Sequence, residues 1–299
     1  MKKKISLIIF IVLSVISTAT NYPIKIVDAY GREVRIEKEP QKIISIAPNI
    51  TDILFNLELD KKIIGRSTYC DYPSEAENVE IVGGMMDPNL EKILKLNPDL
   101  ILVSTHFNKK TLKKIEAFGI PIIGIYGEEK FTGVYDVIKK VAEITNKEEK
   151  GKLIISDIQK RVQNIKDDMK DSKKVKLYYV ISYGRYGDYT AGGNTYINDM
   201  IEIAGGENIA KDLQGWKYSL EKVIEKNPKI IICSKYGGAK KGLENTNGYS
   251  QLEAVKNGKL YEIDNNLLDR QGSRLIEGLE ELNRIIKKGI EGKLQNKKN

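Results

Sequence analysis

One internal repeat constrains the fold of this chain more than any other feature of the sequence. Residues 90–104 read LEKILKLNPDLILVS and residues 220–234 read LEKVIEKNPKIIICS, at a constant offset of 130 residues. Seven of the fifteen aligned positions are identical, without a gap. Because repeats mark repeated structural units, the two segments predict two related halves in one chain. The alternative is a chance likeness between two helix–turn–strand units, which the ungapped identities make the weaker explanation.

Each copy of the repeat predicts a helix that leads into a buried strand. Apolar residues first recur at helical spacing, and an Asn-Pro pair then ends the helix, because proline disfavours helical geometry in the residue before it. A continuous apolar run follows, at residues 100–103 in the first copy and 230–233 in the second. Such a run is typical of a strand covered on both faces in a parallel sheet.

The rest of the chain extends this alternation of helices and strands. Further strand-like apolar runs are found at residues 42–46, 62–65, 122–125, 175–181 and 260–263, and clear helical patterns at 51–57 and 196–204. Residues 134–171 carry two apolar helical stripes and no strand signal. These patterns predict an α/β fold of two Rossmann-like lobes with mainly parallel sheets, joined by a long α-helix.

The same patterns divide the chain of 299 residues into five segments. At roughly 100–200 residues per domain, this length allows two domains. We predict a signal peptide at 1–19, an N-terminal lobe at 20–130, a backbone helix at 131–172, a C-terminal lobe at 173–292 and a basic tail at 293–299.

The first segment has the pattern of an export signal. Three lysines, residues 2–4, precede an apolar run at 5–16, and Ser17-Thr18-Ala19 offers small residues to a signal peptidase. The run is shorter than the roughly 20 residues that span a bilayer. No cysteine lies near this site. We therefore expect a periplasmic protein, secreted through a cleaved signal peptide and not a lipoprotein; an uncleaved membrane anchor is the alternative.

The rarity of histidine and cysteine excludes several kinds of site. The chain has one histidine, His106, and two cysteines, Cys70 and Cys233. A zinc HExxH motif needs two histidines and paired CxxC motifs need more cysteines. No P-loop and no GxSxG motif is present. We predict no catalytic residues, no protein-held metal and no cofactor. His106 is either structural or faces a ligand, and the cysteines form either one disulfide or two buried thiols.

The charge balance argues against a nucleic-acid partner. The formal net charge is +8, but three of the excess lysines lie in the leader and Lys293, Lys297 and Lys298 lie in the tail. The remaining charges are interspersed and form no basic stripe of the kind that follows a phosphate backbone.

The loops after the predicted strands are rich in tyrosine, methionine, glycine and arginine. Ligands of open parallel α/β sheets bind beyond the carboxyl ends of the strands. Tyrosine offers a flat apolar face with a polar end, methionine adapts to irregular surfaces, and arginine donates to carboxylate, phosphate or amide oxygens. The loops suit a bulky ligand with flat and polar parts, and their candidate ligand-binding residues are Pro48, Tyr69, Met85, Met86, Arg185, Tyr189, Asn266 and Arg270.

Four short segments carry a resemblance to a known family. They are residues 44–52 (ISIAPNITD), 67–73 (STYCDYP), 82–91 (VGG followed by PNLE) and 204–208 (AGGEN). With these segments the chain resembles the periplasmic substrate-binding proteins of cobalamin and iron-chelate ABC importers. The resemblance implies two lobes on a rigid backbone helix, a monomer that performs no chemistry, and delivery of a metal chelate to a membrane permease. It also implies that Glu91 and Glu221, which the repeat makes equivalent, dock onto permease arginines.

The resemblance points first to cobalamin or another corrinoid as the ligand. The segment at 67–73 is most similar to the cobalamin-binding branch, and Tyr69, Met85, Tyr189, Asn266 and Arg270 fall where that branch contacts the corrinoid. The chain departs from this branch because the tryptophan expected near Met85 is absent and the acidic residue expected near 266 is asparagine.

Two other chelates and one other class of protein stay open. A haem-binding branch uses a methionine near Met86 as an iron ligand, although its histidine in the C-terminal lobe has no counterpart here. Arg185, Arg270 and Arg274 suit an anionic ferric siderophore. A two-domain enzyme with its site in the cleft is the less favoured class, with Asp71, Asp188 and Asp269 as its available acids.

Overall fold

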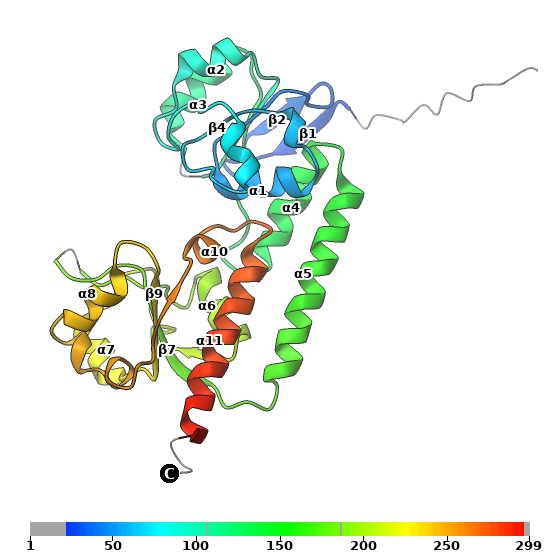
Figure 1. Cartoon of the computed structure of the whole chain (residues 1–299). Coiled ribbons are helices and arrows are strands. Elements are labelled where there is room, and N and C mark those ends of the chain that lie inside the picture. Colours follow the sequence, from blue (N-terminus) through cyan, green and yellow to red (C-terminus); the bar gives the residue numbers. More distant parts are fainter. Residues whose placement is uncertain (1–21, 106, 186, 296–299) are drawn as a thin grey trace, which may run out of the picture.

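The computed structural model describes residues 22–105, 107–185 and 187–295. It contains two four-stranded parallel sheets, in the orders β4-β3-β5-β6 and β10-β9-β7-β8, and an antiparallel β1-β2 hairpin (Figure 1). We call the part with β1–β6 the N-terminal lobe and the part with β7–β10 the C-terminal lobe. The predicted α/β fold of two lobes with parallel sheets is confirmed.

The N-terminal lobe begins with the hairpin and continues as alternating strands and helices. Its elements are β1 (Ile24–Val27), β2 (Glu33–Ile36), β3 (Ile43–Ser45), α1 (Pro48–Asn56), η1 (Asp60–Lys62), β4 (Ile63–Arg66), η2 (Ser74–Asn78), α2 (Leu90–Leu96), β5 (Leu100–Val103), α3 (Lys109–Glu116) and β6 (Ile122–Gly124).

Two helices, α4 (Gly133–Ile144) and α5 (Glu148–Met169), lead to the C-terminal lobe. The elements of that lobe are β7 (Val175–Val180), α6 (Tyr196–Ile203), β8 (Gly206–Asn208), α7 (Leu220–Lys226), β9 (Ile230–Ser234), α8 (Ala239–Asn245), η3 (Tyr249–Gln251), α9 (Glu253–Lys256), β10 (Leu260–Ile263), α10 (Asn266–Asp269) and α11 (Leu275–Gln295).

The repeat forms the same unit in both lobes, α2–β5 and α7–β9. Each helix begins with a side-chain cap, in which Asn89 or Ser219 accepts a hydrogen bond from the backbone N–H three residues on. Each helix ends at an asparagine in the left-handed region, Asn97 with φ 48° and Asn227 with φ 42°. Asparagine tolerates this conformation better than most residues. The prediction of a helix feeding a buried strand is therefore confirmed in both copies.

The connection between the lobes consists of α5 and a second long helix, α11, that lies beside it (Figure 1). The 22 residues of α5 extend over about 33 Å at 1.5 Å per residue. The Arg161 guanidinium donates to both carboxylate oxygens of Glu280 on α11, at 2.8 and 2.6 Å, and Lys287 pairs with Asp168. The sequence analysis missed α11, so the backbone is a helix pair where one helix was expected.

A single large apolar core joins both lobes to this helix pair. It contains buried side chains from the N-terminal sheet (Ile43), from α4 and α5 (Ile138, Ile158), from the C-terminal sheet (Ile230) and from α11 (Leu279). Smaller clusters pack on the other face of each sheet, among them residues of α2 and α3 in one lobe and of α7 and α8 in the other. Because one core runs through the lobes and their connection, the two sheets are held on a common frame.

The structure decides the prediction about the two cysteines, whereas other predictions concern residues that it does not describe. Cys70 and Cys233 are free and buried, one in each lobe, which confirms the alternative of two buried thiols. The leader at 1–19 and His106 lie outside the described residues, and α11 continues to Gln295, inside the proposed tail. The five segment boundaries stay a proposal. Within the described ranges, no helix combines the length and the apolar character needed to cross a bilayer.

The shared core leads to a prediction about stability. Leu279 on α11 is fully buried, whereas Leu153 on α5 is mostly exposed. Leu279→Ala leaves a cavity and should lower the free energy of unfolding by about 2–5 kcal/mol. Leu153→Ala should change it by about 0.5 kcal/mol or less. Urea unfolding followed by circular dichroism measures both, and equal effects of the two substitutions would contradict the assignment of α11 to the core.

Candidate ligand site between the two lobes

A narrow pocket lies where α1 of the N-terminal lobe meets the segment that runs from α10 into α11. Its volume is about 10 Å³, which is room for a single water molecule. The residues that line it come from both lobes and are Pro48, Asn49, Asp52, Tyr72, Asn266, Arg270 and Arg274. Pro48 follows β3, Tyr72 lies in the loop after β4, and Asn266 follows β10. The pocket therefore lies at the carboxyl ends of strands from both sheets, where ligands of such sheets bind.

The inner wall of this pocket is held together by buried and partly buried hydrogen bonds between the lobes. The Asn49 amide donates to the carbonyl of Gln271 at 3.2 Å. The Ser273 hydroxyl and the backbone N–H of Arg274 both donate to Asp52 Oδ2, at 2.8 and 3.2 Å. These bonds fix the segment before α11 to the first turns of α1.

Asp52 is a buried acid at the centre of these contacts. It is 5% exposed, and burial raises its pKa to about 6 although Ser273 and Arg274 donate hydrogen bonds to it. Its ionisation therefore falls close to neutral pH.

The outer side of the pocket is closed by two contacts between the lobes. Arg270 donates to both carboxylate oxygens of Asp71, at 2.6 and 3.4 Å. The Arg274 guanidinium lies over the Tyr72 ring, 3.6 Å from its centre. Partial burial raises the pKa of Asp71, but the hydrogen bonds and charge of Arg270 outweigh this and leave the pKa below its ordinary value. Asp71 is therefore ionised at neutral pH and its pair with Arg270 is charged.

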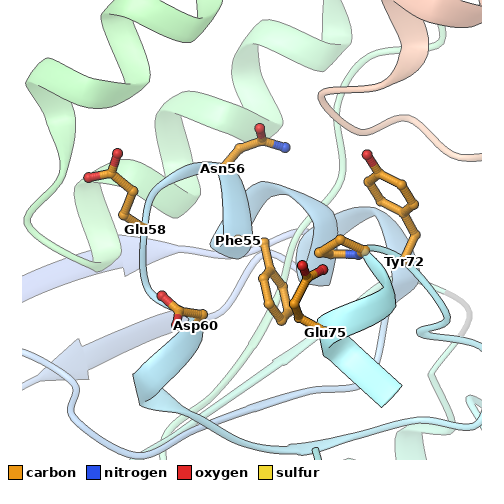
Figure 2. A pocket seen from close by; sticks show the side chains of 7 residues that line it. Phe55, Asn56, Glu58, Asp60, Tyr72 and Glu75 are labelled. Atoms are coloured by element: carbon orange, nitrogen blue, oxygen red, sulfur yellow. The ribbon is translucent and has the colours of Figure 1, made fainter. Parts of the chain in front are cut away.

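Tyr72 also borders two larger hollows outside this pocket. One, of about 370 Å³, lies between the end of α1, η1 and η2, and is lined by Phe55, Asn56, Glu58, Asp60, Tyr72, Pro73 and Glu75. Figure 2 shows these side chains, with Tyr72 on the side of the hollow next to the segment that leads into α11. The other, of about 340 Å³, follows α5 and shares Asn56, Tyr72 and Arg274. Tyr72 thus lines the pocket and both hollows.

The structure brings some of the eight candidate ligand residues together and leaves others apart. Pro48, Asn266 and Arg270 line the pocket. Tyr69 and Met86 are exposed on loops of the N-terminal lobe.

The remaining three candidates lie in different surroundings. Met85 packs against the smaller apolar cluster of the N-terminal lobe, the one that includes residues of α2 and α3. Arg185 is exposed on the loop after β7, and Tyr189 is half-buried and bonded through its backbone to Ser182. These three, with Tyr69 and Met86, do not line the pocket, so the eight-residue set stays a proposal.

Sequence reasoning did not identify the contacts that Asp52 and Asp71 make with the opposite lobe. Asp52 belongs to a motif segment that the analysis quoted, and Asp71 follows a predicted strand. Their partners Ser273 and Arg270 are about 200 residues further along the chain. The only local signal was that all four residues lie in or beside segments that follow strands. This signal places them near the carboxyl edges of the sheets but does not show which residues pair.

Glu91 and Glu221 occupy equivalent places in the two lobes. Each is exposed in the first turn of its helix, α2 or α7. A helix between parallel strands runs antiparallel to them, so both first turns lie at the carboxyl edges of the sheets, on the side of the pocket. Hydrogen bonds from its own backbone N–H and from Ser219 hold the pKa of Glu221 below its usual value, which keeps this carboxylate charged.

The structure has two lobes on a frame of helices and a pocket where strand ends from both sheets meet. This is the architecture of a two-lobed binding protein. A family model described as "Periplasmic binding protein" matches residues 43–267. The chain belongs to this family. The resemblance to substrate-binding proteins of ABC importers is thereby confirmed.

Individual relatives agree with this family. The chain is 33% identical over 267 residues to the uncharacterised ABC transporter substrate-binding lipoprotein YvrC of Bacillus subtilis, covering 87% of this chain and 84% of the relative. It is 28% identical to the vitamin B12-binding protein of Vibrio campbellii, covering 81% and 88%. A crystal structure from Staphylococcus epidermidis, titled a possible iron-binding (periplasmic solute-binding) protein, has a TM-score of 0.75 at 29% identity, covering 83% and 99%.

The comparison with Bacillus subtilis corrects the expected location. We expected a free periplasmic protein, released by cleavage of its signal peptide and not a lipoprotein. The relative with 33% identity is named a lipoprotein, and this contradicts the expectation. The expectation rested on the absence of cysteine beside one assumed cleavage point, and that short segment lies outside the described residues.

The buried Asp52 gives a prediction about pH. Its pKa is about 6 when folded and near 4 when unfolded, so the folded protein holds the proton more tightly. Stability from this group is present below about pH 4 and is lost as the pH rises through about 6, by about 3 kcal/mol in total. Asp52→Asn does not titrate. Its free energy of unfolding, relative to that of the native protein, should therefore rise by about this amount between pH 4 and pH 7.

Urea unfolding of both proteins across this pH range provides the measurement. The contributions of all other groups cancel in the difference between the two proteins. Parallel pH profiles would contradict the burial of an ionising carboxyl at position 52.

Proposed function

We propose that the protein binds a metal chelate between its lobes and delivers it to the permease of an ABC importer, with cobalamin or another corrinoid as the first candidate. The observation that carries the proposal is the pocket at the carboxyl ends of both sheets, to which Pro48, Asn266 and Arg270 come from opposite lobes. The vitamin B12-binding relative from Vibrio campbellii supports a corrinoid.

The chemistry around the pocket suits a ligand with a flat ring system and polar substituents. Tyr69 and Tyr236 are exposed aromatic rings on loops that follow β4 and β9. Asn266 and Arg270 supply amide and guanidinium donors in the pocket, and the Asn266 amide also donates to the Tyr236 hydroxyl at 3.5 Å. Aromatic faces can cover a macrocycle while the donors bind oxygen atoms on its substituents.

A ferric siderophore or haem is the alternative ligand in the same site. The relative from Staphylococcus epidermidis, titled a possible iron-binding protein, favours this class. Arg270 and Arg274 in the pocket and the exposed Arg185 suit the carboxylates of such chelates. Exposed Met86 is the candidate iron ligand if the chelate is haem.

Titration of the protein with cyanocobalamin, haemin and a panel of ferric siderophores tests this function. We expect one-to-one binding of cyanocobalamin, measured by calorimetry and by its visible absorption. Tyr69→Ala should weaken binding about tenfold, since an aromatic contact of this kind is worth on the order of 1–2 kcal/mol. Phe118→Ala is the matched control, because Phe118 is 57% exposed against 58% for Tyr69 and lies after α3, at the other edge of the sheet.

The outcomes separate the candidates. Binding of haemin or a siderophore in place of cyanocobalamin would keep the transport role and change the ligand. An equal loss from Tyr69→Ala and Phe118→Ala would move the site away from the loops after the strands. Failure of every chelate would overturn the proposed function.

The docking role proposed for Glu91 and Glu221 leads to a separate prediction. Replacing both by alanine should reduce chelate uptake by permease-containing proteoliposomes several-fold, because each exposed pair contributes roughly 0.2–1 kcal/mol. Chelate affinity should not change, because both residues lie outside the pocket. Glu225→Ala, an exposed glutamate at the other end of α7, is the control. Normal uptake by the double variant would contradict the docking role.

A further inference from the structure

The pair of Asp71 and Arg270 is one of two contacts between the lobes at the outer side of the pocket. Asp71 lies in the loop after β4 and Arg270 directly after α10, 199 residues apart. Both guanidinium–carboxylate hydrogen bonds are present, at 2.6 and 3.4 Å. The side chain of Arg270 is 21% exposed and that of Asp71 is 52% exposed. The arginine is therefore part of the pocket wall, while its carboxylate partner faces solvent.

The two arginines of the pocket differ in how their charge is balanced. Arg274, which directly precedes α11, has a carboxylate partner in the first turn of that helix, Glu277, at 3.0 Å, and its guanidinium also lies over Tyr72. Arg270 is paired with a carboxylate of the opposite lobe. When the lobes separate at this edge, Arg274 keeps the carboxylate beside it, whereas Arg270 loses Asp71 and exposes two directed donors to the opened pocket.

The pocket must open before a chelate can enter it. A volume of about 10 Å³ holds one water molecule, and a corrinoid or haem is far larger. The inner wall is held by the buried bonds of Asp52 to Ser273 and Arg274. The outer side is held by the Asp71–Arg270 pair and the Arg274–Tyr72 contact. An exposed ion pair contributes only about 1 kcal/mol, so the outer side is the one that opens readily.

We propose that Asp71 determines ligand specificity by occupying Arg270 in the ligand-free protein, in the position that an anionic group of the ligand takes over. The anionic group is a carboxylate or a phosphodiester, because these match the two parallel donors of arginine. A chelate with such a group replaces the Asp71 pair with an equivalent one. A chelate without it breaks the pair and leaves the Arg270 guanidinium without its hydrogen-bonded carboxylate, although the charge of Asp269 lies nearby. This inference rests on the proposed function and narrows its ligand to chelates that carry an anionic group.

Two corrinoids that differ in a phosphodiester group test whether the ligand replaces Asp71 as the partner of Arg270. Cyanocobalamin carries a nucleotide phosphodiester, and dicyanocobinamide has the same ring without it. Asp71→Asn should tighten binding of cyanocobalamin about fivefold, which corresponds to about 1 kcal/mol for the lost competitor. Arg270→Gln should weaken binding of cyanocobalamin about tenfold without weakening binding of dicyanocobinamide. If the protein binds haemin instead, haemin and its dimethyl ester serve as the pair.

Either of two results overturns the inference. Unchanged or weaker binding of the chelate with the anionic group to Asp71→Asn would show that Asp71 does not compete for Arg270. Equal losses of the chelates with and without the anionic group in Arg270→Gln would show that Arg270 does not select that group.

A measurement without ligand tests the contact between the lobes directly. Lys95→Cys and Glu225→Cys place spin labels at exposed, repeat-equivalent positions on α2 and α7, and both native cysteines are buried. Pulsed electron paramagnetic resonance should give a narrow distance distribution in this background. Asp71→Asn or Arg270→Gln should broaden the distribution toward longer distances, and the charge swap Asp71→Arg with Arg270→Asp should narrow it again.

The two experiments fail independently. If no chelate binds, the proposed function is wrong, and the distance measurement still decides whether Asp71 holds the lobes together. Identical distance distributions in all variants would overturn the role of this pair even if a chelate binds in the pocket.

Discussion

Burial of both faces of two parallel sheets is the constraint on which the rest of this structure depends. β5 is apolar along its whole length and β9 is apolar up to its last residue, Ser234, so helices must cover each sheet on both sides. In this chain the inner faces of both sheets share one core with α4, α5 and α11. Because the same helices complete both lobes, the sheets are fixed with strand ends from both at one narrow pocket. The position of the site follows from how the apolar surface is covered.

The polar contacts at the pocket divide into two sets with different strength. Asp52 and Ser273 are buried, and breaking their bond would leave unsatisfied groups away from water. The pair of Asp71 and Arg270 is partly solvated, so water replaces its bonds at low cost. If the proposed function is correct, the weak outer contact would let the lobes admit a ligand while the buried inner contacts keep their shared frame.

The sequence predicted those features that depend on neighbouring residues. The Asn-Pro pairs and the apolar runs after them defined α2–β5 and α7–β9, and strand-end loops marked Pro48, Asn266 and Arg270. The helical spacing of α11 was equally visible at Leu275, Leu279 and Leu282, but it was not used. α5 lies more than 100 residues earlier in the sequence, so the packing of α11 against α5 depends on the tertiary structure and cannot be read from the local pattern.

The pairings across the pocket were beyond sequence reasoning for the same reason. Nothing local to Asp71 or Asp52 indicates Arg270 or Ser273, because these contacts exist only once the shared core has formed. The error about location has a different origin, since a single short motif at the leader was taken to decide it.

The central claim is that a chelate binds between the two lobes at the strand ends. Hydrogen–deuterium exchange with and without saturating chelate, cyanocobalamin or whichever one binds, tests it most directly. The account predicts that the chelate slows exchange in residues 68–73 of one lobe and 264–274 of the other, with little change in the centre of α5. Slower exchange in one lobe alone, or around the hollow of Figure 2 without the strand-end loops of the C-terminal lobe, would contradict it.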